Sequence, residues 1–218
     1  GQVALAELLS GLGRASAGRV ELLGRPWPAD PRALVAAGIA RVPEDRQGTG
    51  VVGDLAVWEN AVSERLATPA FSRAGFLRRA RARAHAARVV DAFDVRGGGL
   101  AAPARALSGG NLQKLVLGRA LLPVEGTAEQ PRCIVAHQPT WGLDVGAVAA
   151  VHRHLLAARD AGAAVLVVSD DLDEVLALGD RIAVMHAGRL TDALPAESWT
   201  RESIGLAMAG HAVPRDAR

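Results

Sequence analysis

The sequence has few of the residues that would place it in a narrow structural class. Its 218 residues include one cysteine, no tyrosine and an aromatic share of 3%. A single cysteine excludes an internal disulfide framework, and because Cys133 lies in an apolar segment we expect a buried, unreactive thiol in a reducing compartment. No apolar run approaches the roughly 20 residues of a membrane-spanning helix, and no signal peptide is recognisable. These absences predict a soluble protein of the cytoplasm.

Charge of one sign is also scarce. Lysine and arginine number 25 against 23 aspartates and glutamates, which gives a formal net charge of +2. This charge is too small to require a nucleic-acid partner. Hydrophobic residues make up 50% of the chain, enough for one substantial core and a subdomain. The chain begins with Gly1 instead of methionine, which suggests a fragment or an excised domain.

One segment departs from this balance, because six arginines occur in a stretch without acidic residues. Two interpretations are open: a patch for nucleic acid or a lipid surface, and a solvated helix. At helical spacing the arginines spread around much of the helix, which favours the second interpretation. The six are Arg73, Arg78, Arg79, Arg81, Arg83 and Arg88.

Strand and helix patterns alternate along the chain, which predicts an α/β fold with a mainly parallel sheet. The apolar run 163–168 is typical of a parallel strand covered on both faces. We expect a polar turn at 44–50, a polar surface connector at 122–131 and a frayed end from 210. Strands are predicted at 19–23, 38–42, 133–136, 163–168, 181–186 and 188–194. Helices are predicted at 3–12, 30–37, 112–122, 144–161, 171–178 and 198–209, with a helical block at 57–95 interrupted near Pro69.

The most informative stretch is Leu107-Ser108-Gly109-Gly110, which opens the helix predicted at 112–122. Ser108 is a favourable N-cap residue. The two glycines leave backbone N–H groups uncovered at a helix start, where the helix dipole favours an anion. The stretch therefore predicts a helix start that contacts phosphate.

A second motif follows the apolar strand at 133–136 and reads Pro139-Thr140-Trp141-Gly142-Leu143-Asp144. The order Leu-Ser-Gly-Gly, then Pro-Thr-x-Gly-Leu-Asp, resembles the ATP-binding cassette (ABC) ATPase family. The resemblance implies a RecA-like P-loop core at 1–50 and 108–196, lacking most of its phosphate loop upstream. It also implies an inserted helical subdomain at 51–107 that ends in the signature, and a C-terminal helix and tail at 197–218.

In this family two cassettes face each other, and each ATP lies between the phosphate loop of one and the signature helix of the other. Gly1 matches the last glycine of that loop, Gln2 stands where lysine is expected, and Val3 where a hydroxyl residue is expected. Lysine neutralises phosphate charge and the hydroxyl binds Mg²⁺, and neither function is open to these two residues. The alternative is an ordinary helix start in a protein without a phosphate loop.

The strand before Pro-Thr-x-Gly-Leu-Asp normally ends in Asp-Glu, which organise Mg²⁺ and the attacking water. Here His137 and Gln138 stand in those places, and Asp170 takes the place of a histidine that senses the γ-phosphate. Histidine is a poor ligand for Mg²⁺, and no second His or Cys near His137 has ligand spacing. We therefore expect no intact catalytic residue and no metal site in this half.

What the resemblance leaves intact is the surface offered to a partner cassette. The residues it implies in ATP binding are Gly1, Gln2, Glu44, Ser108, Gly109, Gly110, Asn111 and Asp144. ATP and Mg²⁺ are the implied cofactors, with the Mg²⁺ site of this half degraded. We expect a cassette that is weak or inactive alone and that completes an active site in its neighbour.

The stretch 38–46, ending Val42-Pro43-Glu44-Asp45-Arg46, resembles the ATPase subunits of simple-sugar and nucleoside importers. Such subunits carry two cassettes, and this chain resembles the second, truncated at its N-terminus. Implied partners are the first cassette, permease subunits that the helical subdomain would touch, and indirectly an external binding protein, which puts the chain on the inner face of the membrane. Glu44 replaces a glutamine of the family, and Trp141 replaces an arginine.

Two other functions stay open at this point. One is a soluble ABC protein that acts on ribosomes or nucleic acid, which the basic segment at 73–88 would favour. Such proteins usually retain the acidic residue before Pro-Thr-x-Gly-Leu-Asp, and Gln138 argues against this alternative. The other is a regulatory cassette that neither hydrolyses ATP nor serves a transported substrate.

Overall fold

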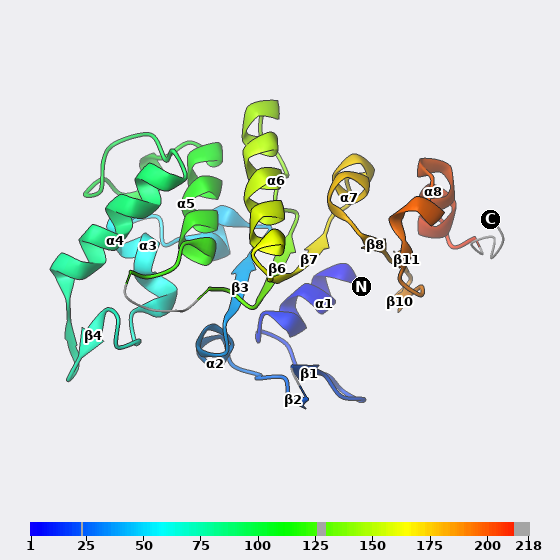
Figure 1. The fold of residues 1–218 in the computed structure, drawn as a ribbon, viewed down its shortest axis with the longest axis horizontal. Helices are drawn as coiled ribbons and strands as arrows, with labels where there is room; N and C mark the ends of the chain where they lie inside the picture. The colour runs from blue at the N-terminus through cyan, green and yellow to red at the C-terminus, as the bar shows by residue number, and fades with distance from the viewer. Residues whose placement is uncertain (23, 126–129, 212–218) are drawn as a thin grey trace.

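A three-stranded parallel sheet forms the centre of the fold in the computed structural model, which describes residues 1–22, 24–125 and 130–211 (Figure 1). The strand order is β3 (Ile39–Val42), β6 (Cys133–His137), β7 (Ala164–Val168). Ile39 pairs with Cys133, and Cys133 pairs with Ala164. The predicted α/β architecture with a mainly parallel sheet is confirmed.

Alternate residues of β6 contribute to two cores, as the two-residue period of a strand requires. Ile134 and Ala136 belong to the large core that also contains Val151 and Leu155 of α6 (Val145–Asp160). Val135 packs on the opposite side with residues of α1 (Gln2–Leu9) and α2 (Pro31–Ala36). Helices therefore cover both faces of the sheet, with α6 on one face and α1 and α2 on the other (Figure 1).

A helical lobe lies beside β3 and joins the same large core. The chain segment predicted as helical at 57–95 is not continuous: a two-stranded hairpin interrupts it, turning at Ala74 and Gly75, both with positive φ. Pro69 marks only the start of this interruption. The lobe consists of α3 (Val57–Val62), a 3₁₀ turn (Ser63–Arg65), β4 (Ser72–Arg73), β5 (Phe76–Leu77), α4 (Arg79–Ala92), a second 3₁₀ turn (Ala104–Ala106) and α5 (Gly109–Leu121).

The C-terminal part has its own small core, built around Trp199. The two strands predicted at 181–186 and 188–194 are wrong as continuous strands, although the tight turn between them is present. Thr191 is the physical reason. Its hydroxyl oxygen accepts a hydrogen bond from the Val184 amide at 2.9 Å, and this side-chain contact interrupts the backbone hydrogen bonds between the two segments. The elements are α7 (Leu172–Leu178), β8 (Arg181–Ile182), β9 (Met185–His186), β10 (Arg189–Leu190), β11 (Leu194–Pro195), a 3₁₀ turn (Ala196–Ser198) and α8 (Arg201–Met208).

Other boundaries also differ from the sequence predictions. Within the strand predicted at 19–23 the structure has β1 (Glu21–Leu22), which pairs antiparallel with β2 (Arg25–Pro26), and residue 23 lies outside the described residues. Gly24 has a φ of +74° between the two strands. The last helix starts three residues later than predicted, since Thr200 caps it by accepting the Ser203 amide. Parts of the predicted connector (126–129) and of the predicted frayed end (212–218) lie outside the described residues.

The expectation that the run 163–168 is covered on both faces is wrong. The side chains of Ala164 and Leu166 are exposed, Leu166 at 38%, and those of Val165, Val167 and Val168 are half-buried. Along its edge, β7 has β6 as its only strand neighbour among the described residues. A cleft of about 680 Å³ lies beyond it, lined by Val165 and Val167 on one side and Ile182 and Val184 on the other. The apolar sequence of β7 therefore faces an open cleft on its outer edge.

A buried ion network joins the lobe to the sheet. Arg119 of α5 is 4% exposed, and its Nη1 donates to the Gly50 carbonyl at 2.7 Å. Its Nη2 lies 3.3 Å from Glu64 Oε1, which also accepts from Arg41 Nε of β3 at 3.2 Å. Glu64 is therefore the shared counter-ion of two arginines from different parts of the fold.

Replacing Glu64 with alanine should lower the free energy of unfolding by about 3 kcal/mol, because it leaves a buried guanidinium without its carboxylate. Urea denaturation measures this change. Asp54→Ala is the matched control: it breaks the exposed Arg105–Asp54 pair and should cost less than about 1 kcal/mol. Equal losses in the two variants would contradict the assigned role of the network.

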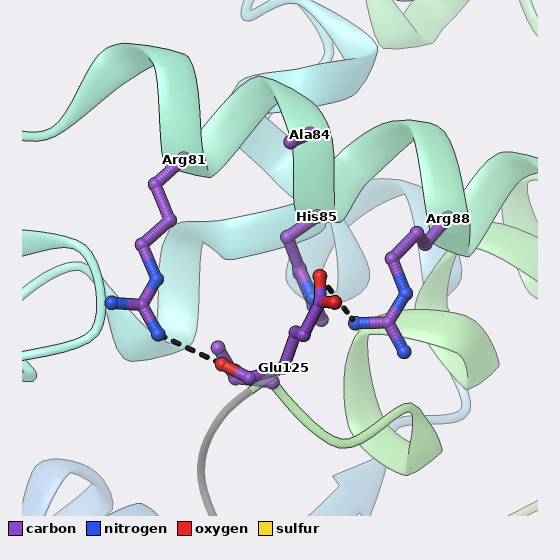
Figure 2. Close-up of a pocket in the computed structure, with 6 residues that line it drawn as sticks. Arg81, Ala84, His85, Arg88 and Glu125 are labelled. Carbon is purple, nitrogen blue, oxygen red and sulfur yellow. Dashed lines mark hydrogen bonds and ion pairs between the residues drawn. The ribbon is translucent and has the colours of Figure 1, made fainter.

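His85 of α4 is another buried polar residue of the lobe (Figure 2). It is 4% exposed, and within the described residues neither ring nitrogen has a hydrogen-bond partner. It borders a cavity of about 200 Å³, across which Arg81 donates to the Glu125 carbonyl at 2.8 Å and Arg88 lies 3.9 Å from the Glu125 carboxylate. Burial, followed by the charges of Arg65 and Arg88, lowers the pKa of His85 from 6.5 to about 4.

The sign of this shift predicts acid destabilisation. The folded state keeps His85 neutral down to about pH 4, whereas the unfolded state takes up a proton near pH 6.5. Stability should therefore fall as the pH drops from 6.5 to 4, by up to about 3 kcal/mol. Unfolding free energies measured across this range should show a smaller loss for His85→Gln. The exposed His211→Gln variant is the control, and an equal flattening by both variants would refute the assignment.

Candidate functional site

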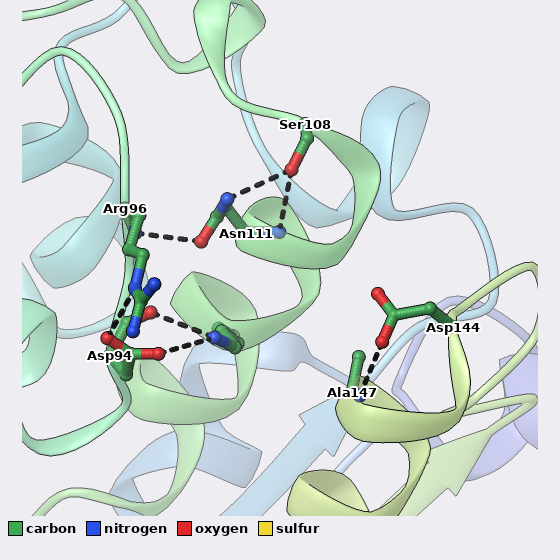
Figure 3. Close-up of polar contacts among 7 residues, drawn as sticks. Asp94, Arg96, Ser108, Asn111, Asp144 and Ala147 are labelled. Carbon is green, nitrogen blue, oxygen red and sulfur yellow. Dashed lines mark hydrogen bonds and ion pairs between the residues drawn. The ribbon is translucent and has the colours of Figure 1, made fainter.

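The start of α5 has the cap that the sequence predicts (Figure 3). The exposed Ser108 Oγ accepts from the Asn111 amide at 3.4 Å and from Asn111 Nδ2 at 2.9 Å. Asn111 Oδ1 in turn accepts from the Arg96 amide at 2.7 Å. The Asn111 side chain thus ties the cap to the preceding loop, while the Ser108 side chain lies at the surface.

The two glycines of this helix start have different surroundings. A Cβ at Gly110 would meet nothing within 4 Å, whereas one at Gly109 would lie 3.0 Å from Arg46 Nη2. Neither glycine has a positive φ. The helix start is therefore open on the Gly110 side, where backbone N–H groups and the helix dipole suit an anion.

The loop that follows β6 lies next to this helix start. Gln113 Nε2 of α5 donates to the Pro139 carbonyl at 2.7 Å, and Arg46 Nη1 donates to the Trp141 carbonyl at 2.6 Å. Asp144 caps α6 by accepting from the Ala147 amide at 3.0 Å (Figure 3). The loop from Pro139 to Asp144 thus contacts α5 through Gln113 and ends at the cap of α6, so the two sequence motifs adjoin in the structure.

His137 and Gln138 lie at the carboxyl end of β6, each 8% exposed. His137 Nε2 is 3.5 Å from Glu44 Oε2 at the end of β3. Gln138 has a positive φ of 48°, its amide donates to the Val168 carbonyl at 2.8 Å, and its Oε1 accepts from the Asp170 amide at 3.3 Å. These contacts connect the carboxyl ends of all three parallel strands.

The first residues of the chain lie beside the cleft that β7 borders. Gly1 precedes α1 and provides no side-chain cap. Gln2 lines the 680 Å³ cleft together with Asp170, and its Oε1 accepts from the amino terminus at 3.0 Å. Val3 is 49% exposed. Of the predicted residues, Gln2 and Asp170 therefore line one cleft. Ser108 and Asp144 do not line it: Ser108 caps α5 and Asp144 caps α6.

The residues present do not form a metal centre. Across residues 1–22, 24–125 and 130–211, no group of three or more His, Cys, Asp or Glu side chains stands close enough to hold an ion. The side chains at the end of β6 are the imidazole of His137 and the amide of Gln138, and neither is a carboxylate of the kind that commonly binds Mg²⁺. Cys133 is half-buried, and burial raises the pKa of its thiol, which agrees with the unreactive thiol expected.

Two polar residues of this region had no role in the sequence predictions. Arg46 bridges to the Trp141 carbonyl across 95 residues of sequence, and nothing local in its turn announces that contact. Gln113 carried a signal, because it is a polar residue on the buried face of an apolar-periodic helix, 2% exposed. A polar group at such a position needs a buried partner, and the Pro139 carbonyl is that partner.

Comparison with protein-family models gives no match. The chain is 37% identical to the nucleoside import ATP-binding protein NupA of Lactococcus lactis over 211 residues, which cover 96% of this chain and 40% of that protein. It is 41% identical to the glucose import ATP-binding protein TsgD13 of Haloferax volcanii over 213 residues, covering 96% and 38%. The guanosine import ATP-binding protein NupO of Bacillus subtilis is 37% identical, with coverage of 96% and 40%. The chain thus spans about two fifths of the length of these relatives.

Solved structures show the same fold. A dimeric post-hydrolysis form of the ATP-binding cassette MJ0796, bound to ADP and Pi, superposes with a TM-score of 0.71 at 21% identity and covers 89% of this chain and 80% of that one. The cassette MJ1267 of an ABC transporter gives a TM-score of 0.72 at 21% identity, covering 95% and 81%. No helix within the described ranges is long and apolar enough to span a membrane. From this fold, and from curated relatives aligned along 96% of its length, the chain belongs to the ATP-binding cassette (ABC) ATPase family.

Proposed function

We propose that this chain is the ATP-binding part of an importer for simple sugars or nucleosides, and that its own nucleotide site does not hydrolyse ATP. The helix start at Ser108 completes instead the ATP site of a neighbouring cassette. The observation that carries the proposal is the contrast between the altered groups at the end of β6 and the open, correctly capped start of α5.

The chemistry of the altered groups supports a silent site. Hydrolysis needs a group that orients the attacking water or accepts its proton, and it needs oxygen ligands for Mg²⁺. Gln138 cannot accept a proton, and its carbonyl oxygen already holds the Asp170 amide. The His137 side chain lies next to the Glu44 carboxylate, and an imidazole supplies no oxygen ligand for Mg²⁺. Since these residues do not fit Mg²⁺, we assign no metal-dependent step to this half.

The partner-facing side has what an interface with a second cassette requires. Ser108 is exposed and the space beyond Gly110 is open. Two large apolar side chains beside the Asp144 loop reach solvent: Trp141 is 66% exposed and Val145 is 87% exposed. Exposed apolar residues of this size commonly mark an interaction surface, and a neighbouring cassette would bury them together with the shared ATP.

The remaining partners follow from the importer assignment. Permease subunits would dock on the helical subdomain at 51–107, which places the protein on the inner face of the membrane, and an external binding protein would act indirectly. The core would comprise 1–50 and 108–196, with 197–218 as the C-terminal helix and tail. Mg²⁺ and ATP would be held chiefly by the phosphate loop of the other cassette. The import ATP-binding proteins among the curated relatives support this scheme.

In the natural polypeptide that carries this chain, Ser108→Ala should lower the ATPase kcat by at least about tenfold, because it removes a phosphate-facing hydroxyl and the cap of α5. Gln138→Ala should leave kcat within about twofold, because this half does not catalyse. Steady-state ATPase measurements on both variants test the difference.

Thr200→Ala is the matched control for the lost cap, since Thr200 caps α8 far from the motifs. It should reproduce any loss of stability in Ser108→Ala without the loss of kcat. Fast Mg²⁺-dependent turnover by the isolated 218-residue chain, or a collapse of kcat in Gln138→Ala, would refute the silent site.

A further inference from the structure

Arg46 is held in place by the turn that it begins. The π-helical turn Arg46–Gly50 follows β3, and Asp45 caps it, its Oδ1 accepting from the amides of Gln47 at 3.0 Å and Gly48 at 2.8 Å. The Asp45 carboxylate is therefore engaged by the turn itself. Among the described residues no carboxylate forms an ion pair with Arg46.

The Arg46 guanidinium has a hydrogen-bond acceptor on a distant loop. Arg46 Nη1 donates to the Trp141 oxygen at 2.6 Å, a short, charge-assisted hydrogen bond. The same loop is anchored on its other side by Gln113, which donates to the Pro139 carbonyl at 2.7 Å. The loop leading to Asp144 is thus held at these two points, one from α5 and one from Arg46 outside it.

The guanidinium also occupies the space beside the signature helix. A Cβ at Gly109 would lie 3.0 Å from Arg46 Nη2, 3.3 Å from Nε and 3.4 Å from Cζ, and a Cβ at Gly142 would lie 3.4 Å from Nη2. Arg46 therefore lies against two glycines that belong to the two different motifs. Gly110 has no such neighbour, which makes it a natural control.

Local stability does not explain this arrangement. Gly109 does not have a positive φ, so its backbone conformation does not require glycine. A guanidinium at a helix N-terminus is opposed by the helix dipole. Neither the glycine at 109 nor the guanidinium beside the helix N-terminus is therefore explained by the stability of α5 itself. The position of Arg46 between α5 and the Trp141 turn indicates a role in the geometry of that surface.

We propose that Arg46 is a positioning residue: it clamps the Trp141–Gly142 turn against Gly109 and so sets the Asp144 loop relative to the phosphate-facing start of α5. The inference rests on the proposed function, in that this surface completes a neighbour's ATP site. Gly109 is then glycine because Arg46 needs the space, and Gly110 because the ligand or the partner does.

A double-mutant cycle tests the clamp in the natural polypeptide that carries this chain. Arg46→Ala should lower the ATPase kcat about tenfold with the KM for ATP within about twofold, since ATP is bound chiefly by the other cassette. Gly109→Ala should lower kcat similarly. The double variant should be no worse than Arg46→Ala alone, because the added methyl then has room. Arg46→Lys, which keeps a donor for the Trp141 carbonyl, should recover part of kcat.

Gly110→Ala combined with Arg46→Ala should instead lose activity independently, as expected for positions without a shared contact. Additive losses for Gly109 and Arg46 would overturn the proposal. So would an Arg46→Ala variant with the kcat of the unaltered protein.

Hydrogen exchange separates the clamp from the proposed function. In Arg46→Ala the amides of Trp141 and Leu143, which bond to the carbonyls of Gln138 and Thr140, should exchange faster than in the unaltered protein, while those of α8 should not change. Unchanged exchange in the turn would refute the clamp. Loss of the proposed function would appear differently, as an unaltered protein without ATPase activity whose exchange pattern still responds to Arg46→Ala.

Discussion

The position of β6 between β3 and β7 is the constraint on which the rest of the site depends. Its register aligns the carboxyl ends of the three strands, so that Glu44, His137 and Asp170 emerge at one edge of the sheet. The alternation of Ile134 and Val135 between two cores prevents a one-residue slip, because such a slip would turn every side chain of the strand to the wrong face. The loop from Pro139 to Asp144 starts from this fixed end, and Gln113 of α5 and Arg46 contact it further along.

The lobe and the sheet behave as one packed body because they share both apolar and charged contacts. The large core runs without a break from Phe71 in the lobe to Ile134 in the sheet, and Glu64 adds a buried carboxylate between arginines of β3 and α5. A displacement of the lobe would separate Glu64 from Arg41, which would leave buried charge uncompensated. Through Arg119 near its C-terminal end and the shared Glu64, α5 is therefore tied to β3 of the sheet as well as to the rest of the lobe.

How far the sequence predicts this molecule depends on the range of the interactions. Local signals worked: Ser108, Asp144 and Asp171 cap helices as their residue types suggest, and the apolar strands form the parallel sheet. The sequence did not predict the long-range contacts. Neither the hydrogen bond from Arg46 to the Trp141 carbonyl nor the interruption of a hairpin by the Thr191 side chain follows from the periodicity of apolar residues. The apolar character of 163–168 predicted a strand covered on both faces, but what packs on the faces of a strand depends on the whole chain and not on the strand's own sequence. Substitutions such as Gln138 were readable as chemistry, and their partners came only from the structure.

The outer edge of β7 has a consequence for handling this polypeptide. The strand of five apolar residues, Ala164–Val168, has β6 as its single strand neighbour among the described residues, and its Leu166 side chain is exposed. Strands of this kind pair readily with any extended segment that reaches them. In concentrated solution two copies of the 218-residue chain would compete to supply that segment to one another, so self-association through β-strand addition would limit the solubility of the isolated polypeptide.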